Sequence, residues 1–87
     1  MERYLVISPH TAEDCAKAIK QIESVGSLTR FDWGCKDGEH TGWVIVEADS
    51  KAEALMVVPS VERPHAKIVK LVKFSPAEVK AMHPTTR

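Results

Sequence analysis

The order of hydrophobic and polar positions divides the chain into alternating strand-like and helix-like segments. Residues 4–8 are an unbroken apolar run that ends at Pro9, which predicts a strand buried on both faces. Thr11 and Asp14 have the spacing of a capping box, and Gly26 stands where a helix commonly ends. Between them, apolar residues recur at helical spacing: Cys15, Ala18, Ile19, Ile22 and Val25. We therefore expect a helix that begins at Thr11 and is closed by Gly26.

The next segments predict a hairpin and a second central strand. Polar and apolar residues alternate over residues 29–35, which is typical of a half-exposed strand at the edge of a sheet. The Asp37-Gly38 step within residues 36–40 is a turn signal, and residues 43–48 are mainly apolar on both faces. We therefore expect an edge strand, a hairpin loop and a returning strand in the interior of the sheet.

Two capping boxes and a lysine-bearing strand occupy the rest of the chain. Ser50 begins the first of these boxes, so a short helix is expected before Pro59. Residues 67–74 predict the last strand, and its lysines are typical of an edge strand that is protected against pairing with other sheets. Ser75 begins the other box, with Pro76 in the favoured first helical position, which predicts a short C-terminal helix.

This order of elements predicts a single α+β domain over residues 1–87. Strand, helix, strand, hairpin, strand, helix and strand is the ferredoxin-like βαββαβ arrangement, whose four-stranded antiparallel sheet has the order 4-1-3-2. Both crossover helices cover one face of that sheet. The other face is also apolar in the first, third and fourth strands, and an exposed apolar patch usually marks an interface. We therefore expect a homodimer in which two sheets pack face to face around a sheet-lined interior.

Composition and charge narrow the classes of partner. The chain has 87 residues, with 12 Lys and Arg against 12 Asp and Glu, so it lacks the basic surface that nucleic-acid binding requires. No segment approaches the roughly 18 apolar residues of a membrane span, and the N-terminus lacks the pattern of a signal peptide. Two cysteines are too few for a disulfide scaffold. We expect a cytoplasmic protein that binds neither nucleic acid nor membranes.

Aromatic and acidic positions on the second and third strands carry a resemblance to a known group. Phe31 and Trp33 lie on an aromatic second strand, a hairpin follows, and the third strand ends in Glu47-Ala48 before a capped helix. With this pattern the whole chain resembles the dimeric α+β-barrel superfamily, and within it the nickel-binding ferredoxin-like and muconolactone-isomerase-like groups. The resemblance implies a ferredoxin-like subunit in a homodimer. It carries over no catalytic residue, because no catalytic motif of the family matches.

Histidine and cysteine residues form two candidate metal sites. His10 follows the first strand and His65 precedes the fourth, so antiparallel pairing puts both imidazoles at the same end of the sheet. Cys35 and His40 stand in the hairpin, which we expect at the opposite end, where the C-terminal helix could bring His83. Imidazole and thiolate ligands suit a divalent transition metal such as zinc, nickel or copper. The alternatives are a packing role for His10, a surface position for His65 and an ordinary polar turn around Cys35 and His40.

The two cysteines have further interpretations. Lys36 beside Cys35 favours a reactive thiolate, whereas Asp37 and Glu39 work against it, and an inert buried thiol is the alternative. Cys15 lies on the apolar stripe of the first helix, where a free cysteine behaves as a small hydrophobe. We therefore expect Cys15 to be a core residue.

Three aromatic residues are the candidates for binding a small ligand. Phe31 and Trp33 share one strand face, and Trp43 belongs to the partner strand of the same hairpin. Such side chains line apolar pockets, and they are also enriched at the buried centre of protein interfaces. Asp32 and Glu47 are the carboxylates nearest to these aromatic residues. Either could act as a base if the pocket removed its water, and the alternative is that both are solvated strand residues.

These residues leave three function classes open. The leading prediction is a homodimer that binds a small ligand or a transition metal at a sheet end or in the dimer cavity. The first alternative is an isomerase- or monooxygenase-like enzyme for a small organic substrate, in which His10 or His40 moves a proton. The second alternative is a subunit that only mediates protein interactions, with its Trp and Phe surface fully covered by protein.

Overall fold

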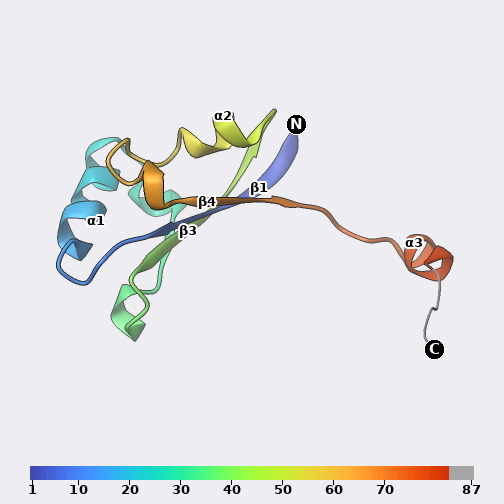
Figure 1. Cartoon of the computed structure of the whole chain (residues 1–87), viewed down its shortest axis with the longest axis horizontal. Helices are drawn as coiled ribbons and strands as arrows, with labels where there is room; N and C mark the ends of the chain where they lie inside the picture. The colour runs from blue at the N-terminus through green and yellow to red at the C-terminus, as the bar shows by residue number, and fades with distance from the viewer. Residues whose placement is uncertain (83–87) are drawn as a thin grey trace.

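The computed structural model describes residues 1–82, which form an α+β fold with a four-stranded antiparallel sheet and three short helices (Figure 1). The sheet order is β2-β3-β1-β4, which reads 4-1-3-2 from the β4 edge. The strands and helices have these bounds: β1 Glu2–Pro9, α1 Cys15–Ser24, β2 Asp32–Trp33, β3 Thr41–Ala48, α2 Lys51–Leu55, β4 Lys67–Leu71 and α3 Pro76–Ala81. The predicted four-stranded antiparallel α+β sheet is therefore confirmed. Within residues 1–82, no helix has the length and apolar character needed to cross a membrane.

The long pairing between β1 and β3 forms the centre of the sheet. It runs from Glu2 opposite Ala48 to Pro9 opposite Thr41, and β4 pairs along the other side of β1. Because these strands are antiparallel, the end of β1 lies beside the starts of both β3 and β4. The residues directly after β1 and those directly before β3 therefore lie at the same end of the sheet.

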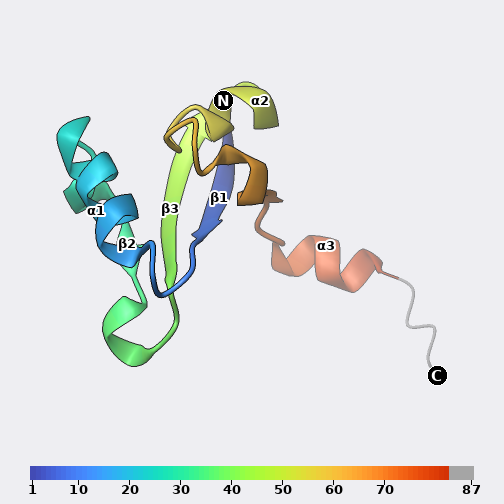
Figure 2. The same ribbon diagram turned by 60° about the vertical axis from the view of Figure 1, so that its left-hand side comes forward.

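The hydrophobic core lies between this sheet and the two helices α1 and α2, which cover one of its faces (Figure 2). Alternate side chains of β1 and β3 point toward the helices and are buried, among them Val6 and Val44. Ile22 of α1, Ala54 of α2 and Val58 after it pack against them. Burial of one such valine or isoleucine contributes about 1.5–3 kcal/mol to folding.

Capping explains where the helices begin. Ser50 and Ser75 act as predicted: each hydroxyl accepts from the backbone N–H of a glutamate three residues later, Glu53 or Glu78. The start predicted for α1 is wrong. The Thr11 Oγ1 accepts from the Asp14 N–H at 3.2 Å and closes a turn, so α1 begins only after that turn.

The strand predicted over residues 29–35 is much shorter in the structure. Only Asp32 and Trp33 pair with β3, and single 3-10 turns lie on either side, over Leu28–Arg30 and Cys35–Asp37. The Gly34 carbonyl accepts from the N–H groups of Asp37 and Glu39, which curls the chain away from the sheet. Of the residues expected on one strand face, Phe31 and Trp33 pack on the core, whereas Thr29 and Cys35 lie in the 3-10 turns.

The last strand also ends earlier than predicted, at Leu71 instead of Phe74. Leu71 pairs with Arg3, and β1 begins at Glu2, so the following residues have no strand to pair with. From Val72 onward the chain leaves the sheet, and α3 lies well away from the rest of the fold (Figure 1).

Candidate metal centre

Four separate segments bring two imidazoles and two thiols to the end of the sheet where β1 stops. His10 follows β1 and His40 precedes β3, and the His10 N–H donates to the His40 carbonyl at 2.9 Å. Cys15 is the first residue of α1, placed by the turn that Thr11 closes. Cys35 opens the 3-10 turn that follows Gly34. The turns and backbone hydrogen bonds of these segments therefore position all four residues at this end of the sheet.

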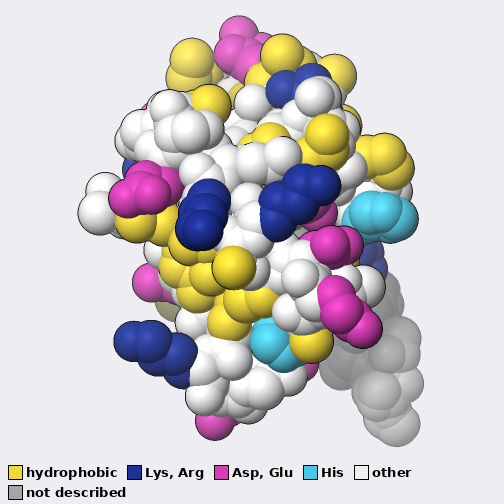
Figure 3. Space-filling view, turned by 90° about the vertical axis from the view of Figure 1, so that its left-hand side faces the viewer, with side chains coloured by type: hydrophobic (Ala, Val, Ile, Leu, Met, Phe, Trp, Pro, Cys, Tyr) yellow, Lys and Arg dark blue, Asp and Glu magenta, His cyan; other side chains and the backbone are white. Residues whose placement is uncertain are grey.

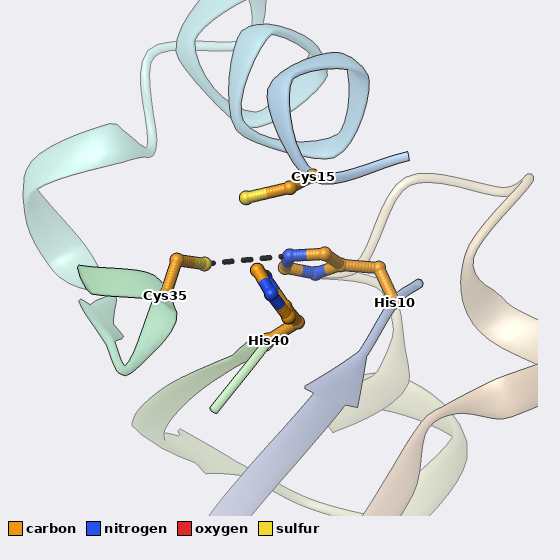
Figure 4. A group of neighbouring side chains, drawn as sticks. All are labelled: His10, Cys15, Cys35 and His40. Carbon is orange, nitrogen blue, oxygen red and sulfur yellow. Dashed lines mark hydrogen bonds between the residues drawn. The ribbon is translucent and has the colours of Figure 1, made fainter. Parts of the chain in front are cut away.

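The four side chains point toward one another (Figure 4). One ligand atom from each residue, an imidazole nitrogen or a sulfur, lies within 4.8 Å of all the others. The Cys35 Sγ is 3.4 Å from the His10 Nε2, and the rings of His10 and His40 meet edge to face with centroids 5.8 Å apart. In a tetrahedral zinc site a thiolate sulfur and an imidazole nitrogen are about 3.5 Å apart, given Zn–S and Zn–N bonds of about 2.3 and 2.0 Å. The distance between Cys35 Sγ and His10 Nε2 is therefore close to that of a tetrahedral ion, and all four donor atoms lie within 4.8 Å of one another.

The protonation states of the cluster follow from its partial burial. Desolvation lowers the pKa of His10, and the adjacent His40 lowers it further, against opposing effects of Glu62 and Asp14. His10 is thereby kept neutral, which is the form that binds metals. Desolvation raises the pKa of Cys35, and its hydrogen bond with Cys15 acts in the same direction. The reactive Cys35 thiolate considered from the sequence is therefore not favoured in the metal-free protein.

One imidazole nitrogen of the cluster has no partner. His40 Nδ1 is buried and makes no hydrogen bond within residues 1–82. A buried polar atom without a partner costs about 1–3 kcal/mol. A ligand that completes the bonding of this ring would remove that cost.

The structure places the predicted metal ligands differently from the sequence analysis. The hairpin with Cys35 and His40 lies at the same end as His10, not at the opposite end, because β1 and β3 are antiparallel. His65 is exposed and lies outside the four-residue cluster, in an open pocket of about 240 Å³ that it shares with His10, Asp14 and Glu62. His83 lies outside the described residues.

Cys15 is the ligand candidate that sequence reasoning missed. It was expected in the core, but it is only half-buried and its sulfur faces the cluster (Figure 4). A signal was present: Cys15 follows His10 by five positions, and His40 follows Cys35 by five positions. This mirrored spacing becomes informative once the end of β1 and the start of β3 are placed side by side.

The three aromatic candidates divide between the two faces of the sheet. Trp43 is paired with Asp32 across the hairpin, so both lie on the face that the helices leave open. Trp33 lies on the opposite face, where it stacks on the buried Phe31 at 5.4 Å and contacts His10 at 6.3 Å between ring centroids. A single chain therefore does not gather Phe31, Trp33 and Trp43 into one pocket; Trp33 instead lies beside the imidazole of His10.

The surface around this end of the molecule is apolar with dispersed charges. In Figure 3, which faces it, hydrophobic side chains gather in the middle, with a histidine at their border. Acidic and basic side chains are interspersed around them, without a field of one sign. This mixture of charges agrees with the zero formal charge of the chain.

Comparison with family models, with curated proteins and with solved structures finds no match to this chain. The resemblance to the dimeric α+β-barrel superfamily therefore stays a prediction. The function is therefore inferred from the two imidazoles and two thiols of the cluster.

Proposed function

We propose that the protein binds one divalent transition metal ion through His10, Cys15, Cys35 and His40, and that this ion is Zn²⁺. The observation that carries the proposal is the convergence of two imidazoles and two thiols from four segments within 4.8 Å. Two sulfur and two nitrogen donors are a common tetrahedral zinc set. Copper(II) prefers tetragonal sites, and magnesium and calcium prefer oxygen ligands, so the donor set disfavours these ions.

The proposed site is structural in kind. Four protein ligands fill a tetrahedral ion and leave no position for water or substrate, whereas catalytic zinc sites keep one position open. The ion would hold the end of β1, the first turn of α1, the turn after β2 and the start of β3 together. Since the donors are not held together in the unfolded chain, the free energy of metal binding adds to the free energy of folding.

A cobalt titration tests the ligand set directly. Purified metal-free protein is titrated with Co²⁺, and tetrahedral coordination by two thiolates is expected to give thiolate-to-cobalt charge-transfer bands and intense visible bands at one equivalent. Excess Zn²⁺ should abolish these bands by displacement. Cys15→Ser should weaken the charge-transfer bands and lower the affinity at least tenfold.

The matched control for the histidine ligands is His65. His40→Gln is expected to lower Co²⁺ affinity at least tenfold, whereas His65→Gln changes an exposed imidazole outside the cluster and should leave the titration unchanged. Absence of charge-transfer bands in the wild-type protein, or equal losses in His40→Gln and His65→Gln, would reject the proposed site.

We also propose a ferredoxin-like topology for the fold and a cytoplasmic location for the protein. Read from β4, the strand order and the two helices on one face support a ferredoxin-like subunit. Cys15 and Cys35 are free thiols, which a metal site requires and a reducing compartment maintains. We therefore keep a ferredoxin-like fold and a cytoplasmic location as the proposed assignments.

A further inference from the structure

The two thiols of the cluster are close enough to react with each other. Cys15 comes from the first turn of α1 and Cys35 from the 3-10 turn after Gly34, and the two sulfur atoms point into the same space, within 4.8 Å of one another (Figure 4). The two thiols are also in hydrogen-bond contact. Both are free and only half-buried, so a small oxidant reaches them from solvent. Oxidation of one sulfur in such a pair is commonly followed by a disulfide with the other.

The segments that carry the two thiols are short and exposed, which lets the sulfur atoms come closer. Asp14, directly before Cys15, is exposed, and α1 begins there without a side-chain cap. The other two residues of the 3-10 turn that Cys35 opens, Lys36 and Asp37, are exposed as well. Helix ends and surface turns of this kind open locally at low free energy. A shift of these two turns, without any change in the sheet, therefore brings the sulfur atoms to bonding distance.

A metal ion and a disulfide compete for the same sulfur electrons. The thiolate is the form of cysteine that binds a metal and also the form that attacks an oxidant. When the two sulfur atoms join each other, the site loses two of its four ligands and keeps only the imidazoles of His10 and His40. Two imidazoles alone do not close a tetrahedral zinc site. Oxidation of the two cysteines therefore removes the ion.

We propose that the cluster is a redox switch, in which hydrogen peroxide oxidises Cys15 and Cys35 to a disulfide and Zn²⁺ is released. This inference rests on the zinc site proposed above. Reduction of the disulfide by a dithiol returns two electrons to the sulfur atoms and restores all four ligands. The site then takes up Zn²⁺ again.

The oxidation takes place in two balanced steps. One thiolate attacks the peroxide, so that an S–O bond forms while the O–O bond breaks, which gives a sulfenic acid and hydroxide. The second thiolate attacks that sulfur, so that the S–S bond forms while the S–O bond breaks and a second hydroxide leaves. Two electrons thus pass from the two sulfur atoms to one hydrogen peroxide molecule. Two protons from solvent convert the two hydroxides to water.

The oxidised protein is expected to stay folded. The hydrophobic core includes neither cysteine, so the shift of the two turns leaves it intact. The disulfide itself joins the first turn of α1 to the turn after β2, as the ion would. The backbone N–H of His10 still donates to the His40 carbonyl and holds the end of β1 beside β3. The switch therefore changes the occupancy of the site without unfolding the chain.

The competition predicts a shift in the reduction potential of the two cysteines. Zn²⁺ binds the reduced form, so at a free concentration of about 100 times its dissociation constant it favours that form about 100-fold. At about 29.6 mV per tenfold change, the potential should rise by about 59 mV. Glutathione redox buffers at fixed free Zn²⁺ measure this potential. A potential that does not respond to Zn²⁺ would overturn the switch.

Peroxide treatment of the zinc-loaded full chain is the direct test. One equivalent of hydrogen peroxide is expected to release one Zn²⁺ per disulfide, measured with a chelating dye, and to link the tryptic peptides of residues 4–17 and 31–36. His65→Gln changes an exposed imidazole outside the cluster and should behave like the wild-type protein. His40→Gln loses a metal ligand but keeps both thiols, so it should still form the same link. Circular dichroism checks that each protein keeps its fold.

The results separate the switch from the zinc site. A wild-type protein that keeps its ion after the link has formed, or that gives only links between chains or oxidation of single sulfur atoms, would overturn the switch and leave the zinc site standing. A metal-free protein that forms the link but gives no charge-transfer bands with Co²⁺ would reject the zinc site, and the release step with it.

Discussion

At the scale of residues, the cluster combines nitrogen and sulfur donors that suit one metal ion. One of its imidazoles is ready to bind that ion, whereas its thiols have to lose protons first. His10 is kept neutral by desolvation and by His40, so it presents a lone pair without first losing a proton. Cys35 is kept as a thiol by desolvation and by Cys15, so its proton has to leave when a metal binds. Binding should therefore be strongly dependent on pH.

The affinity for Zn²⁺ is expected to fall as the pH is lowered. Coordination by two thiols releases two protons, so the affinity should fall by up to about 100-fold for each pH unit by which the pH is lowered. Competition with a chromophoric chelator at several pH values measures this slope. An affinity independent of pH would show that the thiols are not ligands.

Gly34 is predicted to be intolerant of a side chain. An added Cβ would lie 2.7 Å from the Glu39 carbonyl oxygen and 2.9 Å from the ring of Trp43, both closer than real contacts allow. Gly34→Ala should destabilise the protein by about 1–3 kcal/mol and, by shifting Cys35, weaken metal binding. Urea unfolding and metal titration measure the two effects. Lys36→Ala, an exposed change in the same turn, should cause neither, and a neutral Gly34→Ala would contradict the geometry.

At the scale of elements, the sequence predicted the two central strands of the sheet, but it did not predict the length of the edge strand β2, which local hydrogen bonds limit. The apolar runs of β1 and β3 identified them as central strands, because burial on both faces leaves a clear pattern. The short β2 was overestimated because Gly34 draws the chain into a 3-10 turn, and alternation alone cannot reveal that. The hairpin was put at the wrong end for a simpler reason, since the antiparallel pairing of β1 and β3 already fixes its place.

We expect the first turn of α1 to depend on the proposed metal. Its N-cap residue Asp14 makes no side-chain cap, so Cys15 is held there by the turn at Thr11 and by the cluster. Removal of the metal is expected to speed hydrogen exchange of the Ala18 amide, which bonds to the Asp14 carbonyl. Amides in the middle of β1 should keep their protection. Equal acceleration in β1 and α1 would indicate global unfolding and contradict a local role.

At the scale of the whole molecule, a single layer of core side chains supports 87 residues, so added cross-links have a large effect. Zn²⁺ at about 100 times its dissociation constant adds roughly 2.7 kcal/mol of stability. At about 4–8 °C per kcal/mol for a domain of this size, chelation should lower the melting temperature by more than about 10 °C. Calorimetry with and without chelator measures the shift. His65→Gln should keep this response, and an unchanged melting temperature in the wild-type protein would contradict a structural ion.

The measurement that tests the central claim most directly is X-ray absorption at the zinc edge of the protein loaded with one equivalent of Zn²⁺. The account predicts a first shell of two sulfur atoms at about 2.3 Å and two nitrogen atoms at about 2.0–2.1 Å. It also predicts that Cys15→Ser removes one sulfur from that shell. A shell of nitrogen and oxygen alone, or a sulfur count unchanged in Cys15→Ser, would contradict coordination by Cys15 and Cys35.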